Sequence, residues 1–76
     1  MKSFPSQVRA ARGLLNLTQQ DLSDISRVSL RTIVKLERGE KEPSSSIAQA
    51  LRLSLEAAGV EFIPENGGGA GVRLKK

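Results

Sequence analysis

The sequence contains no cysteine and no histidine, and its only aromatic residues are two phenylalanines. Without cysteine or histidine the chain can form no disulfide, no thiolate or imidazole zinc site and no catalytic pair built on these residues. Without Trp or Tyr it also lacks the stacking platforms that hold single-stranded nucleic acid. No apolar run is long enough to span a membrane or to serve as a signal peptide. We therefore expect a cytoplasmic, non-enzymatic protein with no metal, no cofactor and no membrane contact.

The charged residues are distributed unevenly. The formal net charge is +4 over 76 residues, the length of one small domain. Residues 1–39 carry seven basic and three acidic residues, whereas residues 40–76 carry five of each. An anionic partner that meets the first half would explain this distribution, and so would a charged surface that only keeps the protein dissolved. Charge alone leaves both interpretations open.

Start and stop signals predict four helices, over about residues 3–15, 18–26, 29–39 and 44–59. Thr18, Ser29 and Ser44 can cap free backbone N–H groups where the last three helices begin. Gly39 and Gly59 are of the residue type that ends helices. Apolar residues at helical spacing mark the buried sides, namely Val8, Ala11, Leu14 and Leu15 in the first helix and Ile47, Leu51, Leu55 and Ala58 in the fourth.

After Gly59 the pattern changes to two short β-prone runs, residues 60–63 and 72–74. The segment between them is rich in glycine and contains Asn66-Gly67, a strong turn signal. It is not a phosphate-binding loop, because neither the required Lys and Ser/Thr nor a helix follows it. We expect a mainly α fold with a C-terminal β-hairpin, in which residues 1–59 form one domain and residues 60–76 the hairpin.

The third predicted helix has two chemically different faces. With an advance of about 100° per residue, Ile33 and Leu36 lie on one side. Arg31, Lys35 and Arg38 lie on the other. Such a helix can pack on a core through one face and present cations to the major groove of DNA through the other. Its alternative is an ordinary amphipathic surface helix with incidental basic residues.

Residues 17–39 resemble the helix-turn-helix of the lambda-repressor/Cro (Xre) family. The matching positions are Leu17, Gln19, Leu22, Val28, Ser29, Thr32, Ile33, Leu36, Glu37 and Gly39, with Arg12 upstream. The resemblance covers roughly residues 5–58. It implies a small lambda-repressor-like bundle of four or five helices and sequence-specific binding of double-stranded DNA. Residues 1–59 are accordingly expected to form the helix-turn-helix DNA-binding domain.

The resemblance also implies roles for individual residues. The expected base-reading residues are Ser29, Leu30, Arg31 and Lys35, among which Arg31 suits bidentate pairing with guanine. The expected phosphate contacts are Gln19, Arg27, Thr32 and Arg38, with Arg9 and Lys41 as weaker candidates. The family's buried ion pair is expected between Arg12 and Glu37, as a structural element.

The turn between the second and third helices departs from the family pattern. Arg27 occupies the position usually held by Gly, and a left-handed conformation there costs a non-Gly residue about 1–2 kcal/mol. We expect either a different turn or a functional reason for the cation. Ser23 and Ser26 stand where the family packs small apolar residues, so the turn is expected to be looser, with Ile25 taking part in its packing.

Dimerisation is expected through the C-terminal half, with residues 60–76 as the dimerisation element, because a single recognition helix buries too little surface for strong specificity. The candidate residues are Leu53, which lies off the apolar stripe of its helix, and Val60, Phe62, Ile63, Val72 and Leu74 of the hairpin. In the alternative, a monomer, the hairpin folds back on its own helices. The expected function is a homodimeric transcriptional regulator. An antitoxin or other protein-interaction module, with a protein partner and secondary DNA binding, remains the alternative.

Overall fold

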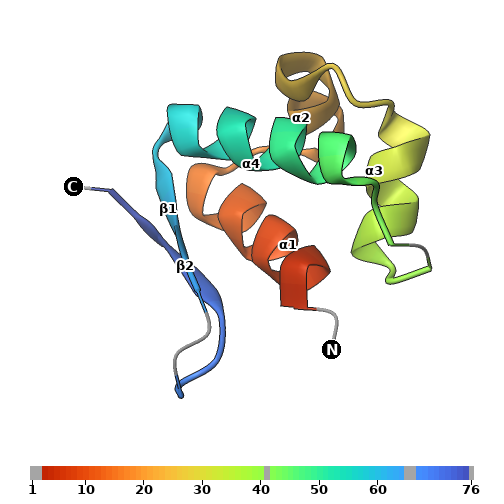
Figure 1. The fold of residues 1–76 in the computed structure, drawn as a ribbon. Helices are drawn as coiled ribbons and strands as arrows, with labels where there is room; N and C mark the ends of the chain where they lie inside the picture. The colour runs from red at the N-terminus through yellow and green to blue at the C-terminus, as the bar shows by residue number, and fades with distance from the viewer. Residues whose placement is uncertain (1–2, 41, 65–66, 76) are drawn as a thin grey trace.

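In the computed structural model the described residues are 3–40, 42–64 and 67–75. They form four helices and one two-stranded antiparallel sheet (Figure 1). The elements are α1 (Ser3–Leu15), α2 (Gln19–Ser26), α3 (Leu30–Glu37), α4 (Ser45–Ala58), β1 (Val60–Ile63) and β2 (Gly71–Leu74). The predicted mainly α, lambda-repressor-like fold with a C-terminal hairpin is confirmed.

Local capping chemistry explains where the helices begin. Thr18 and Asp21 form a reciprocal capping box at the start of α2. The Ser29 hydroxyl accepts a hydrogen bond from the backbone N–H of Thr32 at 3.1 Å, and Ser44 plays the same part for α4. Gly59 adopts φ 123° directly after α4, a conformation that an L side chain rarely adopts. The capping bonds of Thr18, Ser29 and Ser44 satisfy N–H groups that a helix start leaves unpaired.

One hydrophobic core is built from all four helices and the first strand. Its buried apolar residues are Val8, Ala11, Leu22, Val28, Ile33, Leu36, Leu51, Leu55 and Val60. Two predicted core positions are exposed instead. Leu14 lies about 100° around α1 from Leu15 and therefore faces away from the buried stripe, and Ala58 is the last residue of α4, where the chain leaves the core.

The hairpin packs against the helices of its own chain. Val60 pairs with Leu74 and Phe62 pairs with Val72 in the strand register. Val60 is fully buried in the common core, and the Phe62 ring stacks on that of Phe4 with 6.1 Å between ring centroids. The Gln7 amide of α1 donates to the carbonyl of Gly71 at 3.0 Å. The predicted turn residue Asn66 lies outside the described residues.

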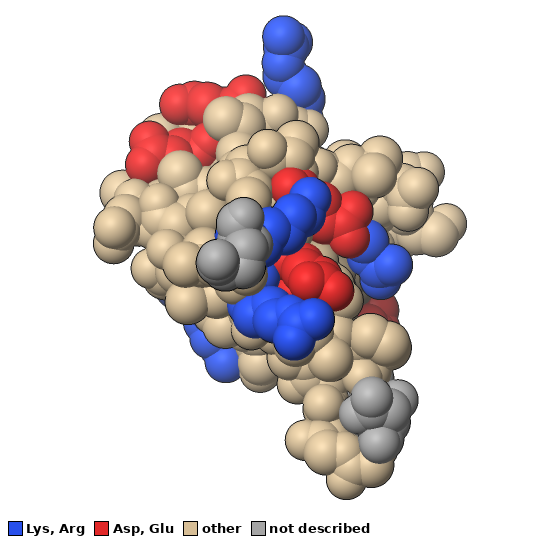
Figure 2. Space-filling view, turned by 90° about the vertical axis from the view of Figure 1, so that its left-hand side faces the viewer, with Lys and Arg blue, Asp and Glu red and all other residues tan. Residues whose placement is uncertain are grey.

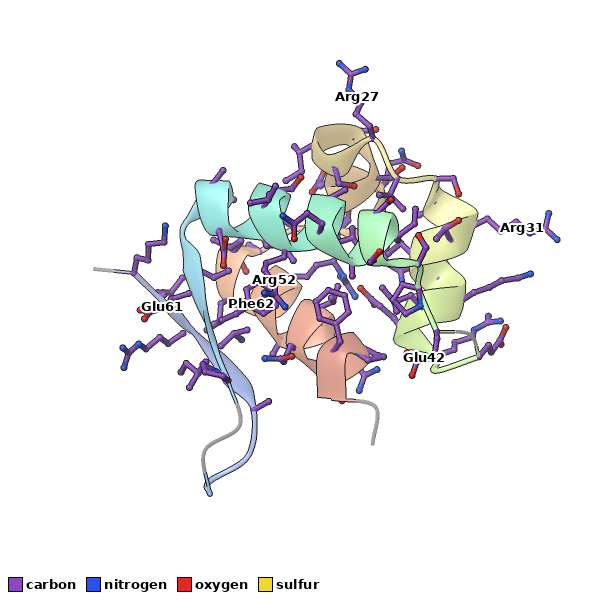
Figure 3. All side chains as sticks on the ribbon, viewed as in Figure 1. Arg27, Arg31, Glu42, Arg52, Glu61 and Phe62 are labelled. Atoms are coloured by element: carbon purple, nitrogen blue, oxygen red, sulfur yellow. The ribbon has the colours of Figure 1, made fainter. Side chains whose placement is uncertain are left out.

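The hairpin and the exposed side of α3 occupy different sides of the molecule. Viewed as in Figure 1, Arg31 projects from α3 at the right of the molecule. Glu61 of the hairpin lies at the opposite, left-hand side (Figure 3). The hairpin side shows basic and acidic side chains interleaved rather than a patch of one sign (Figure 2). The fold thus leaves the basic face of α3 unobstructed by the sheet.

Candidate nucleic-acid interface

α3 presents its basic residues to solvent and its apolar residues to the core. Ile33 and Leu36 are 0% and 2% exposed, whereas Arg31, Lys35 and Arg38 are exposed. Leu30 is 39% exposed beside them. The predicted division of this helix into an apolar and a basic face is therefore confirmed, and the basic face is available to a ligand of opposite charge.

The hydroxyl groups at the start of α3 are bonded to each other. Ser29 donates from its hydroxyl to Thr32 Oγ1 at 2.8 Å, and the same Ser29 oxygen accepts the N–H of Thr32. Ser29 is exposed, and Thr32 is half-buried. Both side chains are held in place before any ligand arrives, which limits the rotamer freedom lost on binding.

The turn between α2 and α3 keeps the left-handed conformation despite its arginine. Arg27 has φ 64° and ψ 18° as the C-cap of α2, and its N–H donates to the carbonyl of Ser23 at 2.9 Å. Ser23 donates from its hydroxyl to the carbonyl of Val28 at 2.7 Å, and the N–H of Val28 donates to the hydroxyl of buried Ser26 at 3.2 Å.

The turn is therefore held by serine hydroxyls, which excludes one of the two alternatives for Arg27 and corrects the expectation for Ile25. Its shape is the one that usually requires glycine, so Arg27 does not signal a different turn. Ile25 was expected to help pack the turn, but its side chain is 48% exposed and lies outside the hydrophobic core. The exposed Arg27 side chain points in a different direction from Arg31 (Figure 3).

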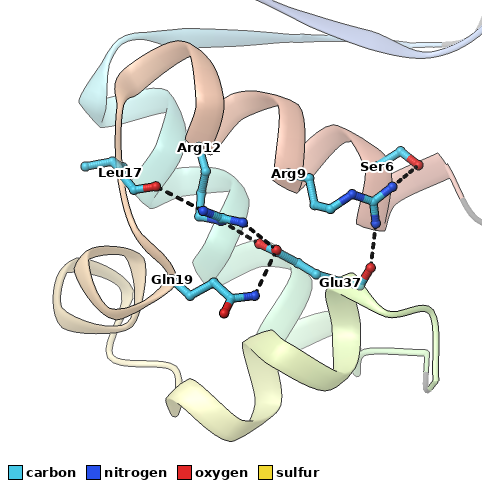
Figure 4. A network of polar contacts seen from close by, with 6 residues as sticks. All are labelled: Ser6, Arg9, Arg12, Leu17, Gln19 and Glu37. Atoms are coloured by element: carbon cyan, nitrogen blue, oxygen red, sulfur yellow. Dashed lines mark hydrogen bonds and ion pairs between the residues drawn. The ribbon is translucent and has the colours of Figure 1, made fainter.

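A polar network around Glu37 joins α1 and α2 to the end of α3 (Figure 4). The Arg12 guanidinium donates two hydrogen bonds to the Glu37 carboxylate, at 2.8 and 2.7 Å, and a third to the carbonyl of Leu17 at 3.0 Å. These bonds to Glu37 raise the pKa of Arg12 above its ordinary value. The predicted Arg12–Glu37 pair is thus present, with Glu37 6% exposed.

Two predicted phosphate contacts belong to the same network. The Gln19 amide donates to Glu37 Oε1 at 3.0 Å, and the Arg9 guanidinium donates to the main-chain carbonyl of Glu37 and to Ser6 Oγ. Arg9 thereby places a cation at the C-terminal end of α3, where the helix dipole favours it. Sequence reasoning missed these bonds, since neither residue type nor spacing encodes which carbonyl a long side chain reaches.

Arg38 occupies the C-cap of α3 beside a surface carboxylate. Its guanidinium lies 3.3 Å from Glu40, with side chains 66% and 47% exposed. An exposed pair of this kind contributes about 0–1 kcal/mol, so an incoming phosphate can replace the carboxylate at little cost. Lys41, another predicted phosphate contact, lies outside the described residues.

A hollow of about 330 Å³ separates the basic face of α3 from the start of α4. Arg31, Thr32 and Lys35 line it on the α3 side. Its other lining residues are Leu36, Glu42, Pro43, Ser44 and Ile47. Two of the four predicted base-reading residues, Arg31 and Lys35, thus line a concave surface, whereas Ser29 and Leu30 do not.

The predicted dimerisation residues differ in what they expose. Leu53 and Leu74 are 53% and 49% exposed, and Phe62, Ile63 and Val72 are half-buried. Val60 has no exposed surface, because its side chain fills the core of its own chain, so it has nothing to offer a second copy. The hairpin is also not isolated, and its packing on α1 and α4 removes the need for a partner to stabilise it.

The sequence model of the helix-turn-helix family matches residues 8–56, from within α1 to within α4. The chain belongs to the helix-turn-helix family of lambda-repressor type. This is a family of DNA-binding transcriptional regulators, and the match ends before the hairpin. Within the described residues of this family member, no helix combines the length and apolar character needed to span a membrane.

Two curated relatives are similar to part of this chain. The transcriptional regulator ClgR of Mycobacterium tuberculosis is 41% identical over 49 residues, in both strain CDC 1551 / Oshkosh and strain ATCC 25618 / H37Rv. The matched segment covers 64% of this helix-turn-helix chain and 44% of either relative. The matched segment therefore spans less than half the length of these regulators.

Proposed function

We propose that this protein is a sequence-specific regulator of transcription that inserts α3 into the major groove of double-stranded DNA and acts as a homodimer. The observation that carries the proposal is the two-faced α3, whose apolar side is fixed in the core while Arg31 and Lys35 project into solvent. An α-helix fits the width of the major groove, and cations on its outer face favour that anionic surface. Membership of a DNA-binding family and a relative named as a transcriptional regulator support the same proposal.

Base reading falls to the residues that the N-terminal half of α3 exposes. Arg31 pairs with guanine O6 and N7, because its planar guanidinium matches two acceptors at once. Leu30 contacts a thymine methyl group, and Lys35 reaches a base edge one turn further along the helix. The Ser29 hydroxyl forms a hydrogen bond with the first base when that bond replaces its present hydrogen bond to Thr32 Oγ1.

The proposed phosphate contacts surround the base-reading residues of α3. Gln19 and Thr32 lie near the starts of α2 and α3, where free N–H groups also favour an anion, and Arg38 exchanges Glu40 for a phosphate. Arg27 adds charge at the margin of this set, and Lys41 stays a weaker candidate contact on its charge alone. Arg9 acts mainly by holding the end of α3, since its guanidinium is already bonded to Glu37 and Ser6.

The test is selection of bound sequences from random duplex DNA, followed by comparison of three arginine variants. Arg31→Ala should weaken binding by about 1–3 kcal/mol and relax preference at one base position. Arg38→Ala should weaken binding to all sequences alike. Arg73→Ala is the matched control, because it removes the same charge from the hairpin side and should change neither affinity nor preference. Unchanged base preference in Arg31→Ala would contradict the placement of α3.

A further inference from the structure

The chain places carboxylates directly beside the cations of α3. The Glu40 carboxylate lies 3.3 Å from the Arg38 guanidinium, the group that the proposed function assigns to a DNA phosphate. Glu42 lines the same hollow as Arg31 and Lys35. Glu40 and Glu42 are both exposed, so the proposed DNA face carries charges of the same sign as the phosphate backbone. A carboxylate on such a face opposes DNA binding, because like charges repel.

The backbone fixes the position of Glu40 at the end of α3. Gly39 turns the chain with φ 75°, and the N–H of Glu40 donates to the carbonyl of Lys35 at 3.1 Å. The N–H of Gly39 donates to the carbonyl of Leu36 at 2.9 Å. These two bonds form a Schellman motif, which ties the residue after the glycine to the last turn of the helix. Glu40 is therefore held beside Arg38 by the helix end itself.

The stability of the fold does not account for this carboxylate. The C-terminal end of a helix carries a partial negative charge, so an anion there is unfavourable. The Arg38 and Glu40 side chains are 66% and 47% exposed, and solvent and salt weaken an ion pair of this kind. The main consequence of the pair is that the charge of Arg38 is partly neutralised before any DNA arrives.

We infer that Glu40 competes with DNA phosphate for Arg38 and thereby limits the affinity of the protein for duplex DNA of any sequence, an inference that rests on the proposed function. A phosphate that takes Arg38 must displace the carboxylate. The displaced carboxylate stays near that phosphate, because the Schellman motif holds its backbone. Binding therefore loses the Arg38–Glu40 pair and meets repulsion as well.

The competition acts on the part of DNA binding that does not depend on sequence. Phosphate contacts carry no sequence information directly, and they supply essentially all of non-specific binding. Arg38 is proposed as a phosphate contact, so its neutralisation weakens binding to selected and random duplexes by the same factor. Glu40 thus reduces the amount of protein held on random DNA without changing which bases Arg31 prefers.

The experiment compares duplex binding by the wild type, Glu40→Gln and Glu61→Gln. At low salt, Glu40→Gln should bind selected and random duplexes about two- to fivefold more tightly per bound protomer, the effect of losing one exposed ion pair. This gain should shrink as salt is added, because salt screens both the pair and the repulsion. An affinity equal to that of the wild type would overturn the inference.

Glu61→Gln is the matched control. It removes the same charge from an Arg–Glu pair on the hairpin side, whose Arg73 and Glu61 side chains are 65% and 48% exposed. Both variants therefore have the same net charge, and Glu61→Gln should gain much less affinity than Glu40→Gln. Equal gains in the two variants would show that only total charge matters and would overturn the inference.

A double variant separates competition for Arg38 from simple repulsion. In an Arg38→Ala background, Glu40→Gln should lose most of its effect, because the contested cation is gone and the two substitutions are then non-additive. The full gain in that background would overturn the competition. Urea unfolding provides a second readout, in which Glu40→Gln should be at least as stable as the wild type. A less stable Glu40→Gln with unchanged affinity would assign Glu40 a structural role instead.

The proposed function and this inference can fail separately. The proposed function is wrong if the wild type binds no duplex, or binds selected and random duplexes equally. The competition is then tested on heparin, a polyanion without bases, by the salt concentration at which each variant elutes. Glu40→Gln should elute at higher salt than Glu61→Gln despite their equal net charge. Elution of both variants at the same salt concentration would overturn the competition at Arg38.

Discussion

Glu37 connects the helices that carry the proposed DNA face. Its buried carboxylate is held by Arg12 and Gln19, and its main-chain carbonyl is held by Arg9. Arg12→Ala should therefore lower the free energy of unfolding by about 3–5 kcal/mol, because it leaves a buried charge without its cation. Urea unfolding followed by circular dichroism measures this loss.

Two comparisons make the Arg12 prediction specific. Arg73→Ala breaks an exposed ion pair and should cost far less than Arg12→Ala, because solvent screens both charges. The double variant Arg12→Met/Glu37→Leu should recover most of the stability lost in Arg12→Ala, since it removes both buried charges together. Equal losses in Arg12→Ala and Arg73→Ala would show that Glu37 is not effectively buried.

Single residues also show which contacts could be predicted from the sequence and which could not. The Arg12–Glu37 pair was predictable, because the family resemblance links two positions that are distant in the chain. The bond from Gln19 to Glu37 was not, since an amide has several partners within reach and only the packed structure selects one. Ile25 was misplaced in the turn because helical spacing does not reveal that serine hydroxyls close that turn instead.

At the scale of elements, local chemistry made the helix starts predictable. Thr18, Ser29 and Ser44 cap the helices as expected, because a capping hydroxyl acts within three residues of itself. The placement of the hairpin depends on contacts between residues more than 50 positions apart, such as Gln7 with Gly71. Short strand patterns carry no information on which helix they pack against, so the burial of Val60 appeared only in the structure.

The two strands of the hairpin are joined by a cross-strand ion pair that gives a pH prediction. The hydrogen bonds and charge of Arg73 hold the pKa of the Glu61 carboxyl below its ordinary value. Lowering of the folded-state pKa means that the ionised form stabilises the hairpin. That stabilisation is present above the ordinary pKa of Glu and is lost as the pH falls through the lowered value.

Titration of the Glu61 carboxyl by NMR measures this effect directly. Arg73→Gln should raise the titration midpoint toward the ordinary value for Glu, and added salt should do so partially, because both groups are exposed. Arg52→Gln is the control, since Arg52 lies over the Phe62 ring rather than against Glu61. A midpoint that Arg73→Gln leaves unchanged would mean that the pair does not persist in solution.

For the whole molecule, the positions of the charged residues indicate more about its partner than the net charge does. Residues 1–39 carry the entire net charge, and the exposed basic face of α3 lies within them. The hairpin side instead mixes both signs (Figure 2). From the sequence alone, the excess of basic residues in 1–39 was compatible with DNA binding and with a role in solubility only. An amphipathic α3 with its cations outward favours DNA, because a solubility role requires no such segregation.

This segregation predicts a strong dependence of DNA binding on salt. If a dimer makes roughly 6–10 phosphate contacts, its affinity should fall about 10³–10⁵-fold between 50 and 200 mM salt, because each neutralised phosphate releases condensed counterions. Arg38→Ala removes two contacts per dimer and should flatten the plot of log affinity against log salt by about 1.8. Arg73→Ala, on the hairpin side, should leave the slope unchanged. Equal slopes for wild type and Arg38→Ala would place Arg38 away from the phosphate backbone, and equal effects of the two variants would mean that only total charge draws this protein to DNA.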